Sequence, residues 1–203
     1  MKREEISGLR ELVESFENAE IIKKGDYEYF IHPLTDGIPE IDPRLLVTAS
    51  DIVVRILSQY DFDKILTVEA LGIPLATAVS IKTQKPLCIA RKRVYEVKGE
   101  VVVKQRTGYS EGIISIFGVK SGEKIAIVDD VLSTGGTLKA IAEGIEKLNG
   151  KIVCSVFLVE KENFRKHSEF NFPIESVMKI KIVDGKVVVS DLHYRCYESA
   201  ERY

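Results

Sequence analysis

Four short apolar runs, separated by segments of helical periodicity, constrain the fold of this chain more than any other feature. Continuous apolar runs of this length are typical of strands in a parallel sheet whose two faces are both covered by helices. The sequence therefore predicts an α/β fold with a doubly wound, mostly parallel sheet. The expected strands are residues 65–68, 87–90, 125–128 and 152–159, and the expected helices are residues 43–59, 73–81 and 136–148.

Other segments flank or interrupt this regular pattern. Residues 2–19 have the apolar spacing of a surface helix, and residues 20–37 suggest a small hairpin followed by a long loop. Residues 93–117 predict a long exposed hairpin, and residues 180–189 predict a final hairpin around Asp184-Gly185. We expect one domain over residues 1–203, with a core at 43–169 and flanking elements at 1–42 and 170–203.

Composition narrows the class of protein. The chain has 29 basic and 31 acidic side chains, a net charge of −2 and 45% hydrophobic residues, which argues against disorder and against a nucleic-acid-binding domain. Cys88, Cys154 and Cys196 are too few and too widely spaced for a disulfide framework. No secretory signal and no apolar run of membrane-spanning length is present, so we expect a cytoplasmic protein without membrane contacts.

The segment from residue 125 to residue 137 carries the clearest chemical signal. Its apolar strand leads into Asp129 and Asp130, then into the loop Ser133-Thr134-Gly135-Gly136-Thr137, and then into a helix. Such a loop presents backbone N–H groups and hydroxyls at a helix start, where the helix dipole also favours an anion. No Lys follows the glycines, unlike in a nucleoside-triphosphate P-loop. A ribose 5-phosphate would satisfy both the loop and the carboxylates.

This segment closely resembles the phosphoribosyl pyrophosphate (PRPP) signature of type I phosphoribosyltransferases. The resemblance implies that residues 133–137 bind the 5-phosphate and that Asp129 and Asp130 orient the ribose. It also implies Mg²⁺ as cofactor, held mainly by substrate and only indirectly by the two aspartates. The implied fold has a flexible hairpin lid and a small hood over the base, with residues of about 1–42 and 170–203 forming the hood and its flanking elements. The implied assembly is a homodimer, with Arg93 or Tyr95 as candidate interface residues.

Other segments match the same family in the expected order. Residues 68–74, including Glu69, Ala70, Leu71 and Gly72, resemble its pyrophosphate loop, and Arg91 and Lys92 would neutralise the pyrophosphate. The hairpin at 94–117 corresponds to its catalytic loop, in which Lys98 or Lys104, with Tyr109 and Ser110, would reach the substrate. Residues 23–39 look like the opening of the archaeal hypoxanthine/guanine phosphoribosyltransferases.

The base-binding residues are expected near the end of the strand at 152–159. Lys161 resembles the Lys that enzymes for 6-oxopurines direct at O6, and an ammonium can only donate hydrogen bonds. Phe170, Phe172 or the pair Val177-Met178 are candidates to stack on the purine. We expect His32 and His193 to be structural.

One residue departs from the hypoxanthine/guanine pattern. Many of those enzymes have Asp where this chain has Ser133, and that Asp handles the proton at purine N7; Glu111 is a candidate replacement. The resemblance implies transfer of the phosphoribosyl group of PRPP to a purine base, giving a nucleoside monophosphate and pyrophosphate. Hypoxanthine and guanine are favoured over adenine, and an orotate enzyme or a PRPP-sensing transcription regulator are further alternatives.

Overall fold

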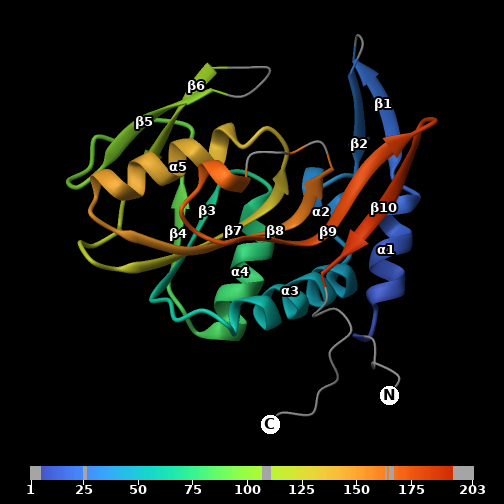
Figure 1. Ribbon diagram of the computed structural model, residues 1–203, viewed down its shortest axis with the longest axis horizontal. Coiled ribbons are helices and arrows are strands. Elements are labelled where there is room, and N and C mark those ends of the chain that lie inside the picture. Colours follow the sequence, from blue (N-terminus) through green and yellow to red (C-terminus); the bar gives the residue numbers. More distant parts are fainter. Residues whose placement is uncertain (1–5, 25–26, 107–110, 163, 165–166, 194–203) are drawn as a thin grey trace.

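A six-stranded sheet forms the centre of the computed structural model, which describes residues 6–24, 27–106, 111–162, 164 and 167–193 (Figure 1). The sheet order is β10-β9-β8-β7-β3-β4. All neighbouring pairs are parallel except β9 with β10. The predicted doubly wound, mostly parallel sheet is therefore confirmed. Its strands are β3 (Lys64–Val68), β4 (Leu87–Ala90), β7 (Lys124–Leu132), β8 (Lys151–Lys161), β9 (Ile174–Val183) and β10 (Lys186–Leu192).

The strand order reverses between β3 and β7. From β3 the chain runs through α4 (Gly72–Thr83) to β4 on one side, whereas β7 pairs with the other side of β3 and continues through α5 (Gly136–Lys147) to β8. In a sheet of this kind a crevice opens at the carboxyl ends of the two strands that flank such a switch point. The loops after β3 and β7 therefore meet at one edge of the sheet.

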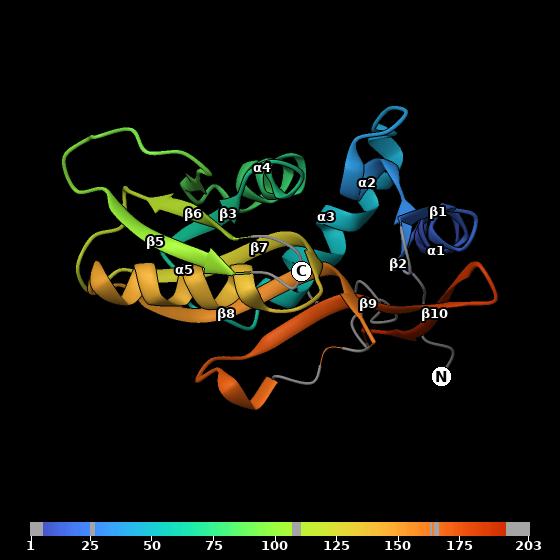
Figure 2. The ribbon, with the colours of Figure 1, turned by 90° about the horizontal axis from the view of Figure 1, so that it is seen from above.

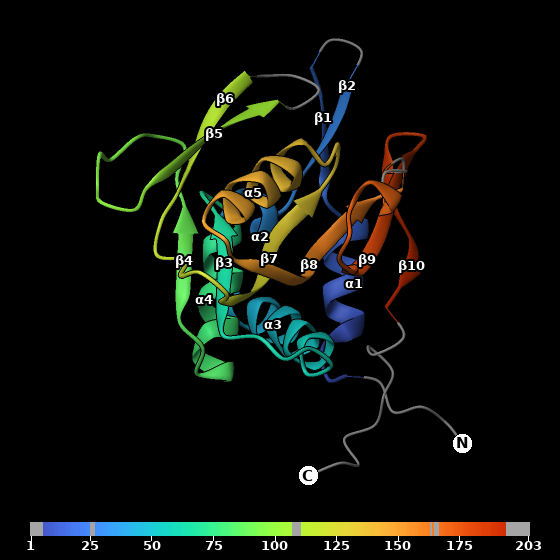
Figure 3. The ribbon, with the colours of Figure 1, turned by 60° about the vertical axis from the view of Figure 1, so that its left-hand side comes forward.

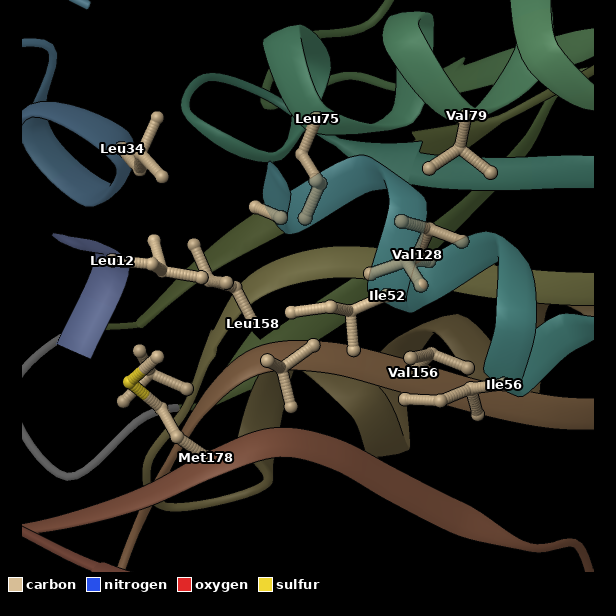
Figure 4. Close-up of a cluster of buried hydrophobic side chains, with 14 of the residues drawn as sticks. Leu12, Leu34, Ile52, Ile56, Leu75, Val79, Val128, Val156, Leu158 and Met178 are labelled. Carbon is tan, nitrogen blue, oxygen red and sulfur yellow. The ribbon is translucent and has the colours of Figure 1, made fainter. Parts of the chain in front are cut away.

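Two apolar layers hold the helices against the sheet. On one face, α1 (Leu9–Glu17), α3 (Pro43–Leu57) and α4 pack on residues such as Val128, Val156 and Met178 (Figure 4). On the other face, α5 packs through Leu138, Ile141 and Ile145. The strands read as continuous apolar runs because both of their faces are covered, and β3 is buried along its whole length.

The hood comprises α1, β1 (Glu20–Lys24), β2 (Tyr27–Ile31) and α2 (Pro33–Asp36). β1 and β2 form a separate antiparallel hairpin. His32 joins the parts of the hood, because its ring stacks on Phe16 and its Nδ1 accepts the N–H of Leu34 at the start of α2. The sequence predicted the hairpin but not the short helix.

The lid is the antiparallel hairpin of β5 (Val101–Arg106) and β6 (Glu111–Ile116). Val103, Ile114 and Ile116 are buried in the same layer as α5, so the lid lies over that helix. Gly144 of α5 makes the close approach possible, since a Cβ there would lie 2.4 Å from Ile116 Cδ1. Seen from above, the lid stands at one end of the molecule and the hood at the other (Figure 2).

Three details differ from the sequence-based expectations. β7 extends to Leu132, so Asp129 and Asp130 lie within a strand and not after it. The final hairpin, β9–β10, continues the main sheet and does not fold over the site as part of the hood. In the described part of the chain the first helix begins at Leu9. No helix of the described residues has the length and apolarity needed to cross a membrane.

Candidate active site

The carboxyl ends of β7 and β8 open into a cavity of about 260 Å³. Lid and hood rise on either side of this edge (Figure 3). The cavity brings together Asp129, the whole loop from Ser133 to Thr137, and Lys161, whereas Asp130, residues 69–72, Arg91 and Lys92 do not line it. Residues that the sequence did not single out complete the lining: Tyr29, Val131, Leu132, Leu138, Ile141 and Phe157.

Asp129 and Asp130 form a carboxyl pair. Asp129 is buried and accepts a hydrogen bond from the Thr67 hydroxyl over 3.4 Å. Burial and the neighbouring charge of Asp130 raise the pKa of Asp129 well above its usual range. Burial also raises the pKa of Asp130 to about 6, with a further contribution from the charge of Asp36 in the hood. Each carboxyl group thus affects the pKa of the other, as expected for two acids side by side in a buried site.

Gly72 ties the end of β3 to this pair. It is the first residue of α4, and a Cβ built on it would lie 1.9 Å from Asp129 Oδ1 and 2.3 Å from Thr67 Oγ1. Only glycine fits so close to the carboxylate. The predicted pyrophosphate loop, residues 69–72, and the acid pair are therefore in direct contact.

The loop 133–137 ends in the amino terminus of α5. Gly135 precedes the helix with φ 76, a left-handed conformation that favours glycine, and no described side chain caps this end. The first N–H groups of the helix therefore remain available to an anion, which the helix dipole also attracts. Phe164 packs directly behind the loop, since a Cβ on Gly135 would lie 2.8 Å from its ring.

Arg91 and Lys92 lie beside residues 69–72, the predicted pyrophosphate loop. Glu69 accepts a short hydrogen bond from the backbone N–H of Lys92, and its second oxygen lies 3.2 Å from Arg91 Nε. Arg91 Nε and Arg93 Nε both donate to the hydroxyl of Tyr95, over 2.9 and 2.7 Å. The loop after β4 thus presents a cluster of cationic groups next to residues 69–72.

The predicted lid residues that the structure describes are exposed and are not among the residues that line the cavity. Lys104 is exposed and lies between the buried Val103 and Gln105, so its side chain leaves the lid on the face away from α5. The interpretation of Lys104 as a residue that reaches the substrate is therefore not supported by its position. Lys98 and Glu111 are exposed, and Tyr109 and Ser110 lie outside the described residues. The lid side chain that does contact the loop 133–137 is Gln105, whose Nε2 donates to Thr137 Oγ1 over 2.5 Å.

Lys161 at the end of β8 and Tyr29 of the hood line the cavity together. Lys161 Nζ lies 5.8 Å from the ring centre of Tyr29 and 5.7 Å from that of Phe30, both in the hood. Phe170 and Phe172 do not reach this cavity. They line a different hollow with Ile145 and Ile152, near the amino end of β8, because the chain turns back there to enter β9. The prediction that they stack on the base is wrong.

The remaining candidates are structural. Val177 and Met178 are fully buried in the apolar layer on the α3 side. Ser15 Oγ lies 3.0 Å from His32 Nε2, and burial lowers the pKa of His32 to about 4. His193 lies 3.0 Å from a carboxylate oxygen of Glu175. Both histidines thus have partners away from the cavity, as expected for structural residues.

The donor set bears on the expected Mg²⁺. Among the described residues, no group of three or more His, Cys, Asp or Glu side chains is arranged to hold a metal ion. The two aspartates alone fit an ion that takes most of its ligands from substrate oxygens and water, which is a common arrangement for Mg²⁺.

Three contacts that come from segments outside β7, α5 and β8 were missed by the sequence analysis: Tyr29, Gln105 and Phe164. Tyr29 comes from the hood, Gln105 from the lid and Phe164 from the segment after β8. Each lies far along the chain from the residue that it approaches. One sequence signal could have found Gln105. It follows Val101 and Val103 at every second position of a lid strand, so it shares their face of the strand although it is polar.

Comparison with known proteins agrees with this architecture. The phosphoribosyl transferase domain model matches residues 43–193. A hypoxanthine/guanine phosphoribosyltransferase from Aciduliprofundum boonei is 48% identical over 182 residues, which are 89% of this chain and 98% of the relative. Another, from Methanobacterium lacus, is 47% identical over 173 residues, or 84% and 90% of the two chains.

Solved structures share the fold at lower identity. An adenine phosphoribosyltransferase from Giardia lamblia, complexed with 9-deazaadenine, superposes with a TM-score of 0.73 at 18% identity, covering 84% of this chain and 98% of that one. The enzyme from Thermoanaerobacter pseudethanolicus gives 0.70 at 23% identity, with 83% and 99% covered. With the family model covering the sheet and the loops that line the cavity, the chain is a member of the type I phosphoribosyltransferase family.

Proposed function

We propose that this enzyme transfers the phosphoribosyl group of PRPP to hypoxanthine or guanine and releases pyrophosphate. The observation that carries this proposal is the presence of Lys161 in the same cavity as Asp129 and the loop 133–137. A hydrogen-bond donor at one end and an anion site at the other match the two ends of a 6-oxopurine nucleotide. The relatives that are named hypoxanthine/guanine phosphoribosyltransferases support the same assignment.

The 5-phosphate would bind at the loop 133–137. Its oxygens would accept hydrogen bonds from the uncapped N–H groups of α5 and from the hydroxyls of Ser133, Thr134 and Thr137. These donors lie on a loop fixed between β7 and α5 and packed against Phe164. A site formed in advance costs little reorganisation when the substrate binds.

The acid pair would bind the ribose hydroxyls at the other side of the same loop. Bond breaking at the ribose leaves positive charge on the sugar, and a carboxylate beside it stabilises that charge. Mg²⁺, when bound with PRPP, would supply positive charge to the departing pyrophosphate. Arg91, Lys92 and the backbone of residues 69–72 would hold that pyrophosphate at the crevice between β3 and β7.

The lid would exclude water while the ribose carries positive charge. Of its predicted residues, Lys98, Lys104, Tyr109, Ser110 and Glu111, we retain Glu111, which begins β6, together with Tyr109 and Ser110, as candidates. Residues 1–42 would cover the base, and residues 43–169 would bind PRPP. We further propose a homodimer, in which Arg93 and Tyr95 are candidate contacts.

Adenine is the second candidate base. Ser133 favours it, because many hypoxanthine/guanine enzymes have Asp at this position. Lys161 opposes it, since the amino group of adenine is itself a donor and would meet a second donor.

A panel of bases tests the proposal. Adenine, hypoxanthine, guanine, xanthine and orotate are each incubated with PRPP and Mg²⁺, and nucleotide formation is followed. We expect turnover with hypoxanthine and guanine. Turnover with adenine alone would transfer the assignment to an adenine enzyme, and turnover with orotate alone would reject a purine substrate.

A further inference from the structure

Gln105 is a buried polar residue of the lid that contacts the candidate phosphate loop. It is 8% exposed, and its Nε2 donates to Thr137 Oγ1 over 2.5 Å. Thr137 is the second residue of α5 and lines the cavity. The contact therefore joins the lid to the place where the phosphate is expected.

The lid strand holds Gln105 firmly in this position. Val103, two residues earlier on the same face, is buried against α5, and Gly144 of that helix gives the lid the room to lie close. Gln105 pairs with Gly112 across the hairpin, where a Cβ on the glycine would lie 3.7 Å from Gln105 Oε1. The amide is thus set with its nitrogen toward Thr137 and its oxygen toward β6.

The direction of this hydrogen bond determines what Thr137 can offer. A hydroxyl has one hydrogen to donate and can accept through its lone pairs. Because Thr137 Oγ1 accepts from Gln105, its own hydrogen has to point elsewhere, and Thr137 lines the cavity. A phosphate oxygen is a strong acceptor for such a hydrogen, and accepting one bond strengthens the bond that a hydroxyl donates.

We propose that Gln105 is a positioning residue that holds the Thr137 hydroxyl as a hydrogen-bond donor to the 5-phosphate. This inference rests on the proposed function, which puts the phosphate at residues 133–137. It makes the affinity for the phosphate depend on a residue of the lid strand as well as on the loop itself. Gln105 touches no substrate and acts through Thr137.

Binding of ribose 5-phosphate, measured by titration calorimetry, tests the proposal. Gln105→Met removes the donor while keeping the length of the side chain, and Gln105→Glu makes the residue an acceptor that takes the Thr137 hydrogen for itself. We expect Gln105→Met to weaken binding several-fold and Gln105→Glu to weaken it roughly tenfold to a hundredfold. In steady state, KM for PRPP should rise while kcat stays near its original value.

A double-mutant cycle separates this role from a merely structural one. In the Thr137→Val background, Gln105→Met should cause no further loss of affinity, because the hydroxyl that it positions is gone. Val102→Thr, on the exposed face of the same strand, serves as the matched control and should bind like the original protein. Circular dichroism confirms that each variant is folded, and Gln105→Glu replaces Gln105→Met if that variant does not fold.

Two results would overturn the proposal. One is a Gln105→Met protein that binds ribose 5-phosphate within twofold of the original. The other is an equal loss in the original and Thr137→Val backgrounds, which would mean that Gln105 acts without Thr137. If the unmodified protein itself does not bind ribose 5-phosphate, the proposed function fails first and the role of Gln105 fails with it.

Discussion

Gly72 and Asp129 approach so closely that no methyl group fits between them. A Cβ on Gly72 would lie 1.9 Å from Asp129 Oδ1. Gly72 begins α4 after β3, Asp129 lies in the last part of β7, and the two residues meet where the strand order reverses. The candidate pyrophosphate site and the acid pair thus cannot move independently.

Substitution of this glycine should affect both parts at once. We expect Gly72→Ala to displace the Asp129 carboxylate or the pyrophosphate loop, and to cost about 1–3 kcal/mol in the free energy of unfolding. A displacement of about 1 Å at a catalytic group can lower turnover roughly a hundredfold. Urea unfolding and initial rates measure the two effects.

Gly112→Ala is the matched control for that variant. An added Cβ at Gly112 would be in ordinary van der Waals contact, 3.7 Å from Gln105 Oε1. This variant should unfold within about 0.5 kcal/mol of the original protein. If Gly72→Ala kept full activity, the close contact between Gly72 and Asp129 would have no functional role.

We expect removal of one carboxyl group of the acid pair to increase stability and to decrease activity. The pKa of Asp130 is raised by burial to about 6 from an ordinary value of 3.8. Between these values the folded protein holds a proton that the unfolded chain has lost, so stability falls as pH rises from about 4 to about 6, and stays lower above. Asp130→Asn removes this loss. We expect the variant to be more stable at pH 7 by about 1–3 kcal/mol while its turnover falls at least about a hundredfold.

Unfolding in urea between pH 4 and pH 8 checks this expectation. Asp184→Asn, in the exposed turn between β9 and β10, is the control and should leave the pH dependence unchanged. An Asp130→Asn protein that is less stable than the original at pH 7 would contradict the raised pKa.

His32 predicts a pH dependence of the opposite sign. Burial lowers the pKa of His32 to about 4 from 6.5, so between these values the unfolded chain binds a proton that the folded protein excludes. Stability is then lost as pH falls from about 6.5 toward 4. Because Asp129 still opposes this trend in the Asp130→Asn background, the acid-induced loss due to His32, roughly 2–3 kcal/mol, is expected as the difference in pH dependence between that background with and without His32.

His32→Asn should flatten that dependence. Asn keeps an acceptor for the N–H of Leu34 but lacks the ring that stacks on Phe16, so we expect a cost of about 1–3 kcal/mol at pH 7. Fluorescence-monitored unfolding at pH 5 and pH 7 measures both quantities. An unchanged slope between the two pH values would show that another group causes the acid sensitivity.

The sheet could be predicted from sequence because its strands are short, apolar on both faces and separated by helices with clear periodicity. The loop 133–137 could be predicted because its residues are contiguous, so their chemistry and their position coincide. Tyr29 and Gln105 could not be predicted in the same way. Their role depends on where two exposed hairpins lie relative to the sheet, and no local pattern specifies that.

Phe170 and Phe172 show that a local pattern can also place a residue in the site wrongly. Aromatic residues after a strand that ends near a ligand are reasonable stacking candidates by spacing alone. Here the chain reverses toward the amino end of β8 so that β9 can pair parallel to it, and this carries both rings away from the cavity. Parallel pairing requires such a return, and the composition of residues 162–173 does not reveal its path.

Lys161 gives a prediction about base specificity. Its ammonium can donate to the O6 of hypoxanthine or guanine but meets another donor on adenine. Lys161→Met keeps much of the side-chain length and apolar contact with the rings of Tyr29 and Phe30. We expect kcat/KM for hypoxanthine and guanine to fall roughly tenfold to a hundredfold, and adenine to compete as well as before or better.

Lys186→Met, at an exposed position, is the control and should change none of these values. Because a general disturbance of the hood would weaken every base equally, a uniform decrease for all three bases would argue against recognition of O6 by Lys161.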